Sequence, residues 1–349
     1  MRVLIDTTFV RRAPYSGTAV YLNAIGAALS ELGGVEVVEA CNERRRSPAG
    51  GGLGSVRNML ADRHWVAAEL PRLARQAGAQ LIHHPLPAQA RGFRGPQVLT
   101  VHDLAFERLP QHFKPGFRRY AHLAHRAASR AAAAVICVSQ TTAADVIALW
   151  GVPSERIVVA PHGPGQELAQ LSCPRAAAGA DPGSHFLYVG DDEPRKDLPT
   201  LLSAYEAYRQ AAPDPLPLVL AGSAEARGRG VRCEHHPSRE RLAELYREAV
   251  ALVHASLYEG FGLTALEAMS VGTPVIAAPA PGVIETCGEA ARYYAQQDPR
   301  SLALAMLELQ AEPALRAELS ERGRRRAAAF SWASSARAHL DAYSLALGA

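Results

Sequence analysis

Two glutamates eight positions apart, Glu259 and Glu267, flank an apolar run that is interrupted by Gly260 and Gly262. The whole stretch, Leu257–Ala278, reads LYEGFGLTALEAMSVGTPVIAA. Glycine has no Cβ, so the backbone N–H groups beside it are open to a ligand, and a helix N-terminus favours negative charge. The pattern predicts a helix whose start can hold a phosphate, with one carboxylate before it and one inside it.

The second carboxylate is expected to bind a pair of ligand hydroxyls. The helix is expected to begin near Leu263, which places Glu267 one turn inside it. A carboxylate can accept two hydrogen bonds from a vicinal diol such as that of a ribose. The neighbours Leu266, Ala268 and Met269 are apolar and would make a poor solvated face. The structural alternative is that the first glutamate caps the helix and the second faces solvent.

Two adjacent cations, Arg195 and Lys196, follow a predicted strand that ends at Gly190. Cations placed together beyond a strand end suit a diphosphate that gains charge as it leaves. The chain has 35 arginines and only two lysines, which indicates that a compact point charge is wanted here. A solvated turn is the alternative. The nearby Asp191 and Asp192 are not expected to hold a metal, because no third ligand is close in the sequence.

The first half of the chain offers two further candidates. Gly17 lies just before a predicted helix, in YSGTAVY, where a phosphate could approach the backbone. Ala19 stands where a GxGxxG motif would have its second glycine. His102 follows an apolar strand in TVHDLAF and could donate to sugar hydroxyls or shuttle a proton. The alternatives are an ordinary turn glycine and a buried structural histidine. Weaker candidates at comparable strand ends are His83, His84 and His162.

Composition bounds the class of protein. The 349 residues are 48% hydrophobic and 20% charged, enough for two domains with sizeable cores. The net charge of +3 is unevenly divided. Residues 1–165 carry 19 Lys and Arg against 11 Asp and Glu, and the remainder carries 18 against 23. A basic first half suggests an acidic partner, such as an anionic lipid surface or a phosphorylated acceptor, and a bias in solvated charge is the alternative.

Several classes of protein are disfavoured. The five cysteines form no CxxC pair, so we expect neither a metal site nor a disulfide framework, and reduced thiols in the cytoplasm. The N-terminal MRVLIDTTFV is a predicted strand rather than a signal peptide. No apolar run reaches the length of a membrane span, so a soluble or peripheral protein is expected. Aromatic and basic residues are not interleaved, which disfavours nucleic-acid binding.

The elements that must position these residues alternate between strand and helix, which predicts an α/β fold with parallel sheets and crossover helices. Residues 42–58 are expected to form a glycine-rich loop, and 167–184 a link between two domains. The expected strands are 2–6, 35–40, 81–84, 97–103, 134–139 and 156–161, then 185–190, 217–222, 251–256 and 274–278.

The motifs together resemble one enzyme family. SLYEGFGLTALEAMSVGTPVIAA is similar to the E-x7-E signature of retaining glycosyltransferases of family four. VHDL, VICVSQTTAADVIALWGVPSERIVVAPHG, YVGDDEPRKDL and a closing FSW extend the resemblance over the chain. It implies the GT-B arrangement, two Rossmann-like domains facing each other across a cleft. It also implies retaining transfer of a sugar from a nucleotide diphosphate sugar, with no metal and no other cofactor.

The resemblance assigns roles to individual residues of the donor site. Glu259 would contact the donor sugar, with the backbone of Phe261, Gly262 and Leu263 beside it, and Glu267 would bind the ribose hydroxyls.

For the phosphates and the reaction centre, the resemblance implies further roles. Arg195 and Lys196, which follow the strand end at Gly190, would stabilise the diphosphate, Gly17 would lie against the phosphates, and His102 would line the reaction centre. Ala19 is a departure from the family's first loop, and the base pocket is expected near Cys233–His235.

The implied domains are an N-terminal acceptor domain, 1–166, completed by a helix at 333–349, and a nucleotide-sugar donor domain, 185–332. By the same resemblance, the acceptor would be a hydroxyl of a glycan, a lipid-linked sugar or a small molecule. Basic residues that could meet an anionic acceptor are Arg44, Arg45 and Arg46 in a loop and Arg118, Arg119, Arg126 and Arg130 on a helix.

The resemblance therefore implies a hexosyltransferase, with mannosyl favoured over glucosyl transfer and polysaccharide biosynthesis as the setting. It is expected in the cytoplasm, or peripheral on the inner face of the membrane through its basic first half. Two alternatives stay open at this point, a nucleotide-sugar epimerase and a non-catalytic nucleotide-sugar-binding protein.

Overall fold

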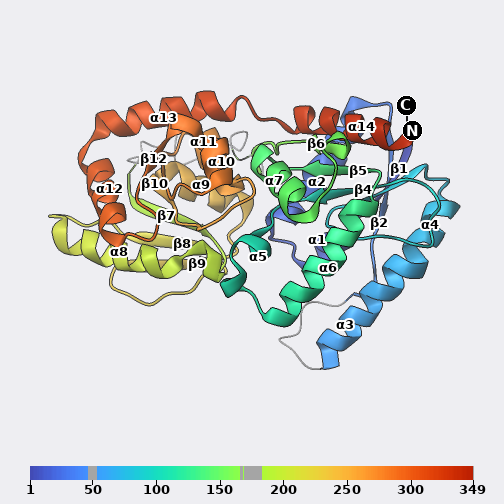
Figure 1. Ribbon diagram of the computed structural model, residues 1–349. Helices are drawn as coiled ribbons and strands as arrows, with labels where there is room; N and C mark the ends of the chain where they lie inside the picture. The colour runs from blue at the N-terminus through green and yellow to red at the C-terminus, as the bar shows by residue number, and fades with distance from the viewer. Residues whose placement is uncertain (46–52, 166–167, 169–182, 349) are drawn as a thin grey trace. The chain divides into compact units, whose positions relative to one another are not determined.

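A computed structural model describes residues 1–45, 53–165, 168 and 183–348. The chain divides into two compact units, each with its own sheet (Figure 1). Unit 1 comprises Met1–Gly163 and Ser331–Ala349, and unit 2 comprises Pro164–Phe330. Most of the segment expected to link two domains, 167–184, lies outside the described residues.

The sheet of unit 1 has six parallel strands in the order β2-β1-β3-β4-β5-β6. The order reverses beside β1, because β2 pairs on one side of it and β3 on the other. In open parallel sheets, ligands bind beyond the carboxyl ends of the strands at such a reversal. The strands are β1 (Arg2–Asp6), β2 (Glu36–Ala40), β3 (Leu81–His84), β4 (Gln97–Val101), β5 (Ala134–Cys137) and β6 (Ile157–Val159).

The helices of unit 1 connect these strands. One sequence-based expectation is wrong here: a helix begins at Leu53, inside the predicted loop 42–58, because the helix formers after the glycines carry the chain on into the next helix. The described helices are α1 (Thr8–Arg12), α2 (Gly17–Leu32), α3 (Leu53–His64), η1 (Trp65–Glu69), α4 (Leu70–Gln76), α5 (Ala105–Arg108), η2 (Pro110–His112), α6 (Pro115–Ala131), α7 (Gln140–Asp145), η3 (Val146–Trp150), η4 (Ser154–Arg156) and α14 (Trp332–Leu347).

The sheet of unit 2 is also parallel and six-stranded, in the order β12-β11-β10-β7-β8-β9. The edge strand β9 was not expected, because its residues VRCEH are mostly polar and only partly buried. The strands are β7 (His185–Gly190), β8 (Leu218–Gly222), β9 (Val231–His235), β10 (Ala249–His254), β11 (Val275–Ala277) and β12 (Ala291–Tyr293).

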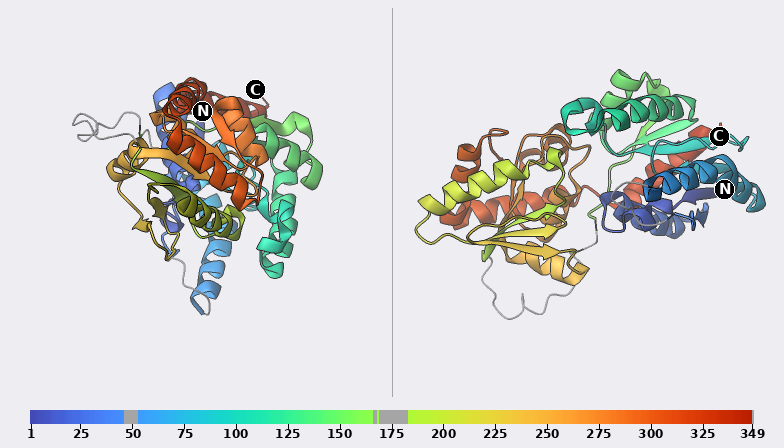
Figure 2. Two further views of the ribbon diagram at one scale, coloured as in Figure 1. Left: turned by 90° about the vertical axis from the view of Figure 1, so that its left-hand side faces the viewer. Right: turned by 90° about the horizontal axis from the view of Figure 1, so that it is seen from below.

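The helices of unit 2 cover both faces of its sheet (Figures 1 and 2). In the described part of the chain, no helix combines the length and the apolar character needed to cross a bilayer. The described helices are η7 (Pro194–Lys196), α8 (Leu198–Ala211), α9 (Arg239–Glu248), α10 (Leu263–Val271), α11 (Pro281–Cys287), η8 (Gly288–Ala290), α12 (Pro299–Ala311) and α13 (Pro313–Ala327).

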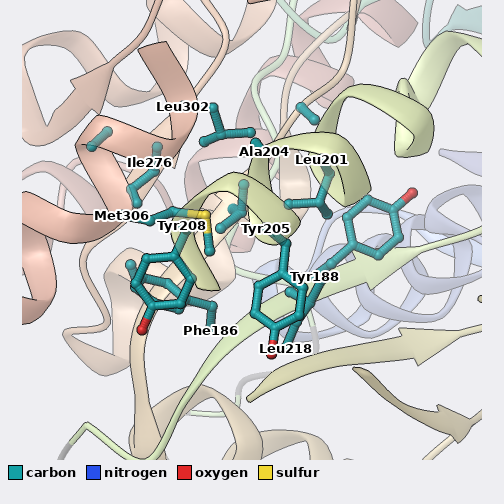
Figure 3. Packing of buried hydrophobic residues seen from close by; sticks show 14 of the residues in the cluster. Phe186, Tyr188, Leu201, Ala204, Tyr205, Tyr208, Leu218, Ile276, Leu302 and Met306 are labelled. Carbon is teal, nitrogen blue, oxygen red and sulfur yellow. The ribbon is translucent and has the colours of Figure 1, made fainter. Parts of the chain in front are cut away.

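The core of unit 2 fixes the strands that carry the candidate site. Tyr205 and Tyr208 of α8 pack with Phe186 of β7, and Met306 of α12 belongs to the same buried cluster (Figure 3). These four side chains are at most 2% exposed. All six residues of β10 are buried, as expected for a central strand covered on both faces. A rigid pair of neighbouring strands, β7 and β10, is the result.

The last helix packs in unit 1 through a buried polar network. Tyr21 of α2 contacts both Thr100 Oγ1, at 2.9 Å, and His339 Nε2 of α14, at 2.8 Å. His83 contacts the Tyr343 hydroxyl at 2.8 Å and Thr100 at 2.9 Å. All five residues are fully buried. Buried polar groups are costly unless they are hydrogen-bonded, so this network ties α14 specifically to β3, β4 and α2.

Candidate functional site

The candidate site lies in unit 2, at the carboxyl ends of the neighbouring strands β7 and β10. After β7 the chain runs through a loop to η7, which holds Arg195 and Lys196. After β10 it runs through a loop to α10, and Glu259 lies on this loop. The Leu257 N–H donates to the Arg195 carbonyl at 2.8 Å, so a backbone hydrogen bond holds the two loops together.

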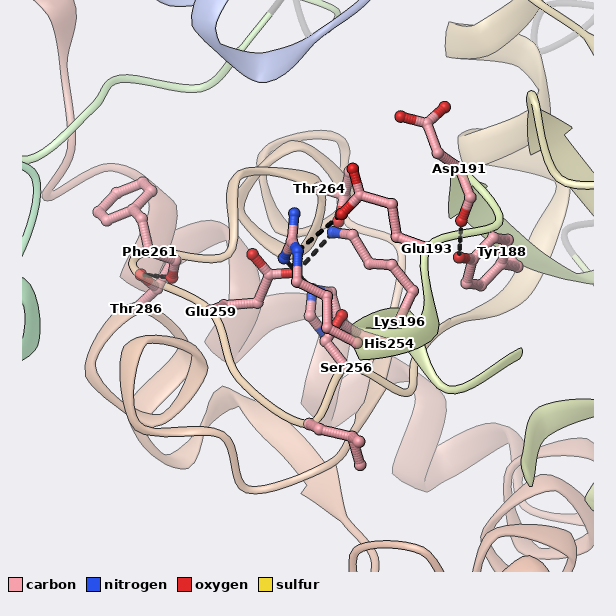
Figure 4. A network of polar contacts seen from close by, with 12 residues as sticks. Tyr188, Asp191, Glu193, Lys196, His254, Ser256, Glu259, Phe261, Thr264 and Thr286 are labelled. Carbon is pink, nitrogen blue, oxygen red and sulfur yellow. Dashed lines mark hydrogen bonds and ion pairs between the residues drawn. The ribbon is translucent and has the colours of Figure 1, made fainter. Parts of the chain in front are cut away.

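The structure brings Lys196 into direct contact with Glu259 (Figure 4). Arg195 contacts the same carboxylate. The Lys196 ammonium donates to Glu259 Oε1 at 2.5 Å, and the Arg195 guanidinium lies 3.2 Å from the same oxygen. Arg195 also pairs with Glu193 at 2.7 Å. The side chains of Arg195 and Lys196 are each 16% exposed and that of Glu259 is 11% exposed, so these charges are largely removed from solvent screening.

Electrostatics fix the protonation of Glu259. Burial alone would raise the pKa of its carboxyl, but Lys196 and Arg195 outweigh burial and hold that pKa well below its usual range. Glu259 is therefore an anion at every physiological pH. It offers an acceptor for ligand hydroxyls and cannot act as an acid.

His254 is a member of this cluster that the sequence analysis missed. It ends β10, is 5% exposed, and its Nε2 lies 3.9 Å from Glu259 Oε1. Burial lowers its pKa to about 4, against the opposing influence of Glu259, so the ring is neutral at pH 7. The signal that singled out His102, a histidine at the end of an apolar strand, is equally present here.

The backbone at the start of α10 is shaped by glycines. Gly262 has φ +97°, a left-handed conformation that favours glycine, and α10 begins at Leu263 as predicted. A Cβ on Gly282 would lie 2.3 Å from the Glu259 carbonyl oxygen, so α11 approaches this loop at backbone contact. The Thr286 hydroxyl donates to the Phe261 carbonyl at 2.5 Å. Contacts with α11 therefore fix the position of the loop that carries Glu259.

Glu267 is buried inside α10, at 3% exposure, and does not face solvent. The Tyr246 hydroxyl donates to its Oε2 at 2.9 Å. Burial raises the pKa of Tyr246 well above its usual range, and the adjacent carboxylate raises it further, so Tyr246 stays a donor. A Cβ on Gly165 would lie 1.9 Å from Glu267 Oε1. Only a glycine allows the chain this close to the carboxylate.

Gly190 lies at a second point of close backbone approach. It pairs in register with Gly222 across β7 and β8, and a Cβ on Gly222 would lie 2.4 Å from the Gly190 carbonyl oxygen. Beyond Gly190, the Asp191 side chain accepts from Ser223 at 2.6 Å. Within the residues that the structure describes, no cluster of three or more His, Cys, Asp or Glu side chains is arranged to hold a metal.

The other two predicted site residues, Gly17 and His102, belong to unit 1. Gly17 is the first residue of α2, whose N-cap Ser16 accepts from the Ala19 N–H at 3.2 Å. His102 follows β4, contacts the Pro85 carbonyl at 3.1 Å and stacks on His162 at a ring distance of 5.5 Å. Burial lowers the pKa of His102 to about 4, so its ring is neutral at pH 7.

The remaining predicted regions have the following surroundings. Cys233–His235, the expected base pocket, forms most of β9, whose last residue pairs in register with Gly222. In the arginine loop, Arg45 pairs with Asp62 at 2.5 Å and Arg44 with Glu69 at 3.1 Å. Arg46 lies outside the described residues.

Two family models match the chain. The model described as Glycosyltransferase Family 4 matches residues 15–164, and the one described as Glycosyl transferases group 1 matches residues 177–326. The two matches fall on the two units in turn, and the second includes the Arg195, Lys196 and Glu259 cluster.

Curated relatives and a solved structure agree with these matches. The chain is 27% identical over 270 residues to O-antigen chain mannosyltransferase B of Escherichia coli, covering 71% of this chain and 70% of that one. It is 32% identical over 229 residues to the MMP alpha-(1->4)-mannosyltransferase of Mycolicibacterium hassiacum, covering 61% of this chain and about half of that one, 54%. The sucrose-phosphate synthase of Thermosynechococcus elongatus superposes with a TM-score of 0.80 at 22% identity, covering 98% of each chain, which shows the shared GT-B fold.

Proposed function

The chain belongs to glycosyltransferase family four, and from this premise we propose that it transfers a hexosyl group, with retention, from a nucleotide diphosphate sugar to a hydroxyl acceptor. The observation that carries the proposal is the contact of Arg195 and Lys196 with Glu259 beyond the ends of β7 and β10. Two cations and one permanent anion in a largely desolvated site match a donor that is a diphosphate at one end and a polyol at the other.

In the proposed reaction, the bond between the anomeric carbon and the diphosphate oxygen breaks and its electron pair stays on that oxygen. The acceptor oxygen forms the new bond to carbon on the same face, and its proton passes to the leaving phosphate. The diphosphate gains negative charge during this step. Arg195 and Lys196 are already in place, so they stabilise the transition state more than the bound donor. Because these two residues supply the positive charge, we propose that the reaction needs no metal.

Glu259 has a different proposed role before and after donor binding. In the structure it neutralises Lys196, which keeps two desolvated cations from repelling each other. When a diphosphate takes over the cations, the carboxylate is released to accept hydrogen bonds from the sugar hydroxyls. His254 lies 3.9 Å from Glu259 and is neutral, so it adds no charge to the site when Glu259 exchanges Lys196 for the sugar hydroxyls.

The rest of the donor is proposed to lie along the backbone of the same unit. Phe261, Gly262 and Leu263 offer N–H groups at the start of α10, and Glu267 is proposed to bind the ribose hydroxyls. Gly190, the last residue of β7, is proposed as a further backbone contact of the donor.

For unit 1 we propose that Gly17 lies against the phosphates, that His102 lines the reaction centre and that the acceptor binds there. The order of the strands supports this, because both residues follow the carboxyl ends of β1 and β4, which flank β3.

The sugar and the setting are proposed from the relatives. Two of them are named as mannosyltransferases and one of these acts on an O-antigen chain, which favours mannosyl over glucosyl transfer and a polysaccharide as the product. The net charge of the first half supports the further proposal that this half works against an anionic membrane surface in the cytoplasm.

The donor is identified by thermal shift against GDP-, UDP- and dTDP-sugars, because a ligand that binds only the folded state raises the melting temperature. Sugar transfer and donor hydrolysis are then measured in the parent, Lys196→Ala and Glu259→Ala. Either substitution is expected to lower kcat about 100-fold or more, Lys196→Ala because the leaving charge loses a stabilising cation, and Glu259→Ala because the reacting sugar loses a hydrogen-bond acceptor. Glu193→Ala is the matched control, since Glu193 contacts the same Arg195 from an exposed position.

Two outcomes would contradict the proposal. Conversion of the free nucleotide sugar to its epimer would indicate the epimerase. Donor binding without hydrolysis or transfer, in the parent and both variants, would indicate a binding protein.

A further inference from the structure

Helix α6 presents an apolar stripe to solvent. Phe117 is 48% exposed, Tyr120 66% and Leu123 60%. The three residues recur at intervals of three, so they share one side of the helix. The opposite side, with Ala121, Ala128 and Ser129, is buried against unit 1. Three large apolar side chains in a row on a solvent-facing helix mark an interaction surface rather than scattered surface residues.

The same helix is strongly basic and contains no acidic residue. Arg118, Arg119, Arg126 and Arg130 lie on it, and Lys114 precedes it. In the part of the chain that the structure describes, none of these five cations lies within ion-pair distance of a carboxylate, whereas eight other described arginines pair at 3.0 Å or less. Arg119, Arg126 and Arg130 fall next to Leu123 around the helix, so unneutralised charge borders the apolar stripe.

A second helix of unit 1 has the same character. α3 exposes Val56, Met59 and Leu60 at 49%, 52% and 57%, beside Arg57 and Arg63. In both Figure 1 and Figure 2, α3 and α6 extend on the same side of unit 1. Together they hold six of the twelve large apolar side chains that are exposed in the described chain. The apolar surface is therefore concentrated rather than spread over the molecule.

We propose that α6, supported by α3, docks unit 1 on an anionic lipid bilayer. Phe117, Tyr120 and Leu123 enter the boundary between headgroups and acyl chains, and the arginines contact lipid phosphates. An apolar stripe bordered by arginines is the pattern of a helix that lies in the membrane surface, and each cation near an anionic bilayer adds to the attraction. A second copy of this chain is a poorer occupant, because the identical basic faces would repel each other. The inference does not depend on the transferase reaction, since docking needs neither donor nor acceptor.

The test is co-sedimentation with vesicles of phosphatidylcholine that do or do not contain phosphatidylglycerol, at low and high salt. The parent is expected to bind only the anionic vesicles, and less at high salt. The variant with Phe117→Ser, Tyr120→Ser and Leu123→Ser is expected to bind about tenfold more weakly, a loss of ~1.4 kcal/mol. The variant with Arg119→Gln and Arg130→Gln is expected to lose affinity for the anionic vesicles alone. Leu304→Ser with Ile147→Ser is the matched control, because these side chains are exposed elsewhere, at 64% and 42%.

A melting curve shows whether each variant folds, and Tyr120→Trp provides a reading that does not depend on loss of binding. Its added fluorescence should shift to shorter wavelength when anionic vesicles are mixed with the protein, as an indole does on entering an apolar layer. The proposal is overturned if the parent binds neither vesicle, if the folded serine variant binds as the parent does, or if the Tyr120→Trp emission is unmoved. Sedimentation velocity without lipid is the last arm, and self-association abolished by the serine substitutions would assign the surface to a second copy instead.

Discussion

At the scale of single residues, Glu259 is the carboxylate on which the charges of the site converge. It contacts Lys196 and Arg195 and lies near His254, all in one small volume of unit 2. The pKa of Glu259 is depressed in the folded chain. The ion pair therefore stabilises the fold at every pH above the pKa that glutamate has in the unfolded chain. The contribution is lost only as the pH falls below that value toward the depressed pKa.

Removing one partner of this buried pair should lower the free energy of unfolding more than removing both partners does. Glu259→Gln leaves two largely buried cations without their anion, and we expect it to destabilise unit 2 by about 3 kcal/mol. Adding Lys196→Met should recover part of that loss, so that the double variant is more stable than the sum of the singles implies. Calorimetric unfolding of the four proteins measures the coupling, and strictly additive effects would show that the pair is not coupled. Glu193→Gln, at an exposed pair, should change stability by less than about 0.5 kcal/mol.

Gly165 provides a second prediction at this scale. An alanine there would place a methyl group 1.9 Å from the Glu267 carboxylate, which must move. If Glu267 binds the ribose, Gly165→Ala should raise the donor Kd about tenfold, an effect of the size that overpacking causes, and leave the chemistry at Lys196 unchanged. Titration calorimetry with the donor checks this. Gly116→Ala is the control, because a Cβ there meets nothing within 4 Å, and equal affinities in both variants would separate Glu267 from donor binding.

At the scale of elements, the turn between η7 and α8 is held in an unusual conformation. Asp197 follows Lys196 directly and has φ +51°, which side chains with a Cβ rarely adopt. It is 8% exposed and caps α8 without a side-chain hydrogen bond. The conformation of this one residue therefore decides where the lysine lies relative to the strand end.

Substitutions at Asp197 should separate backbone conformation from charge. Glycine and asparagine tolerate positive φ, so Asp197→Gly and Asp197→Asn should leave stability within about 1 kcal/mol of the parent. Asp197→Val should cost about 2 kcal/mol more, because a β-branched residue is strained there. Urea unfolding measures the difference. A valine variant as stable as the glycine variant would show that the turn relaxes.

The alternation of strands and helices was predictable because each buried strand is a short β-branched run between longer helical segments. The two parallel sheets follow from it, and β1, β3, β7 and α10 have the expected bounds or lie within a residue of them. Local composition gives a wrong prediction of secondary structure where the element is not built around a buried apolar face. The polar edge strand β9 has no apolar pattern, and glycines around residue 52 hide the start of α3.

The site was predictable in its residue types but not in its contacts. Glycines, a carboxylate and two cations beyond strand ends are visible in the sequence. The contact of Glu259 with Lys196 depends on β7 lying next to β10, a non-local pairing that no local pattern encodes. The proximity of Gly165 to Glu267 is of the same kind, since it joins residues far apart in the chain.

At the scale of the whole molecule, buried neutral histidines make stability depend on pH. Burial lowers the pKa of His102 and of His339 in unit 1 to about 4, and that of His254 in unit 2 to about 4. The unfolded chain binds protons near pH 6.5, where the folded chain does not. Stability should therefore be complete above about pH 6.5 and fall as the pH drops from there toward about 4.

Differential scanning calorimetry across that range measures the effect. His339→Gln should lower the melting temperature at neutral pH, since it disturbs the contact with Tyr21, and should flatten the pH dependence. His64→Gln is the control for the loss of a histidine outside the buried network, because that side chain is 51% exposed. A melting temperature that is constant from neutral pH to about pH 4.5 would contradict the prediction.

The position of α14 has a consequence for biosynthesis. Trp332, His339 and Tyr343 are among the buried residues of unit 1, although they follow all of unit 2 in the chain. A polypeptide leaves the ribosome from its N-terminus, and domains generally fold in that order. Unit 1 therefore cannot complete its buried network until α14 has emerged, because Tyr21 still lacks its contact with His339 and His83 its contact with Tyr343. Unit 2 is a single continuous segment and can be folded by then. During translation, unit 2 should therefore complete its fold before unit 1, although most of unit 1 is synthesised first.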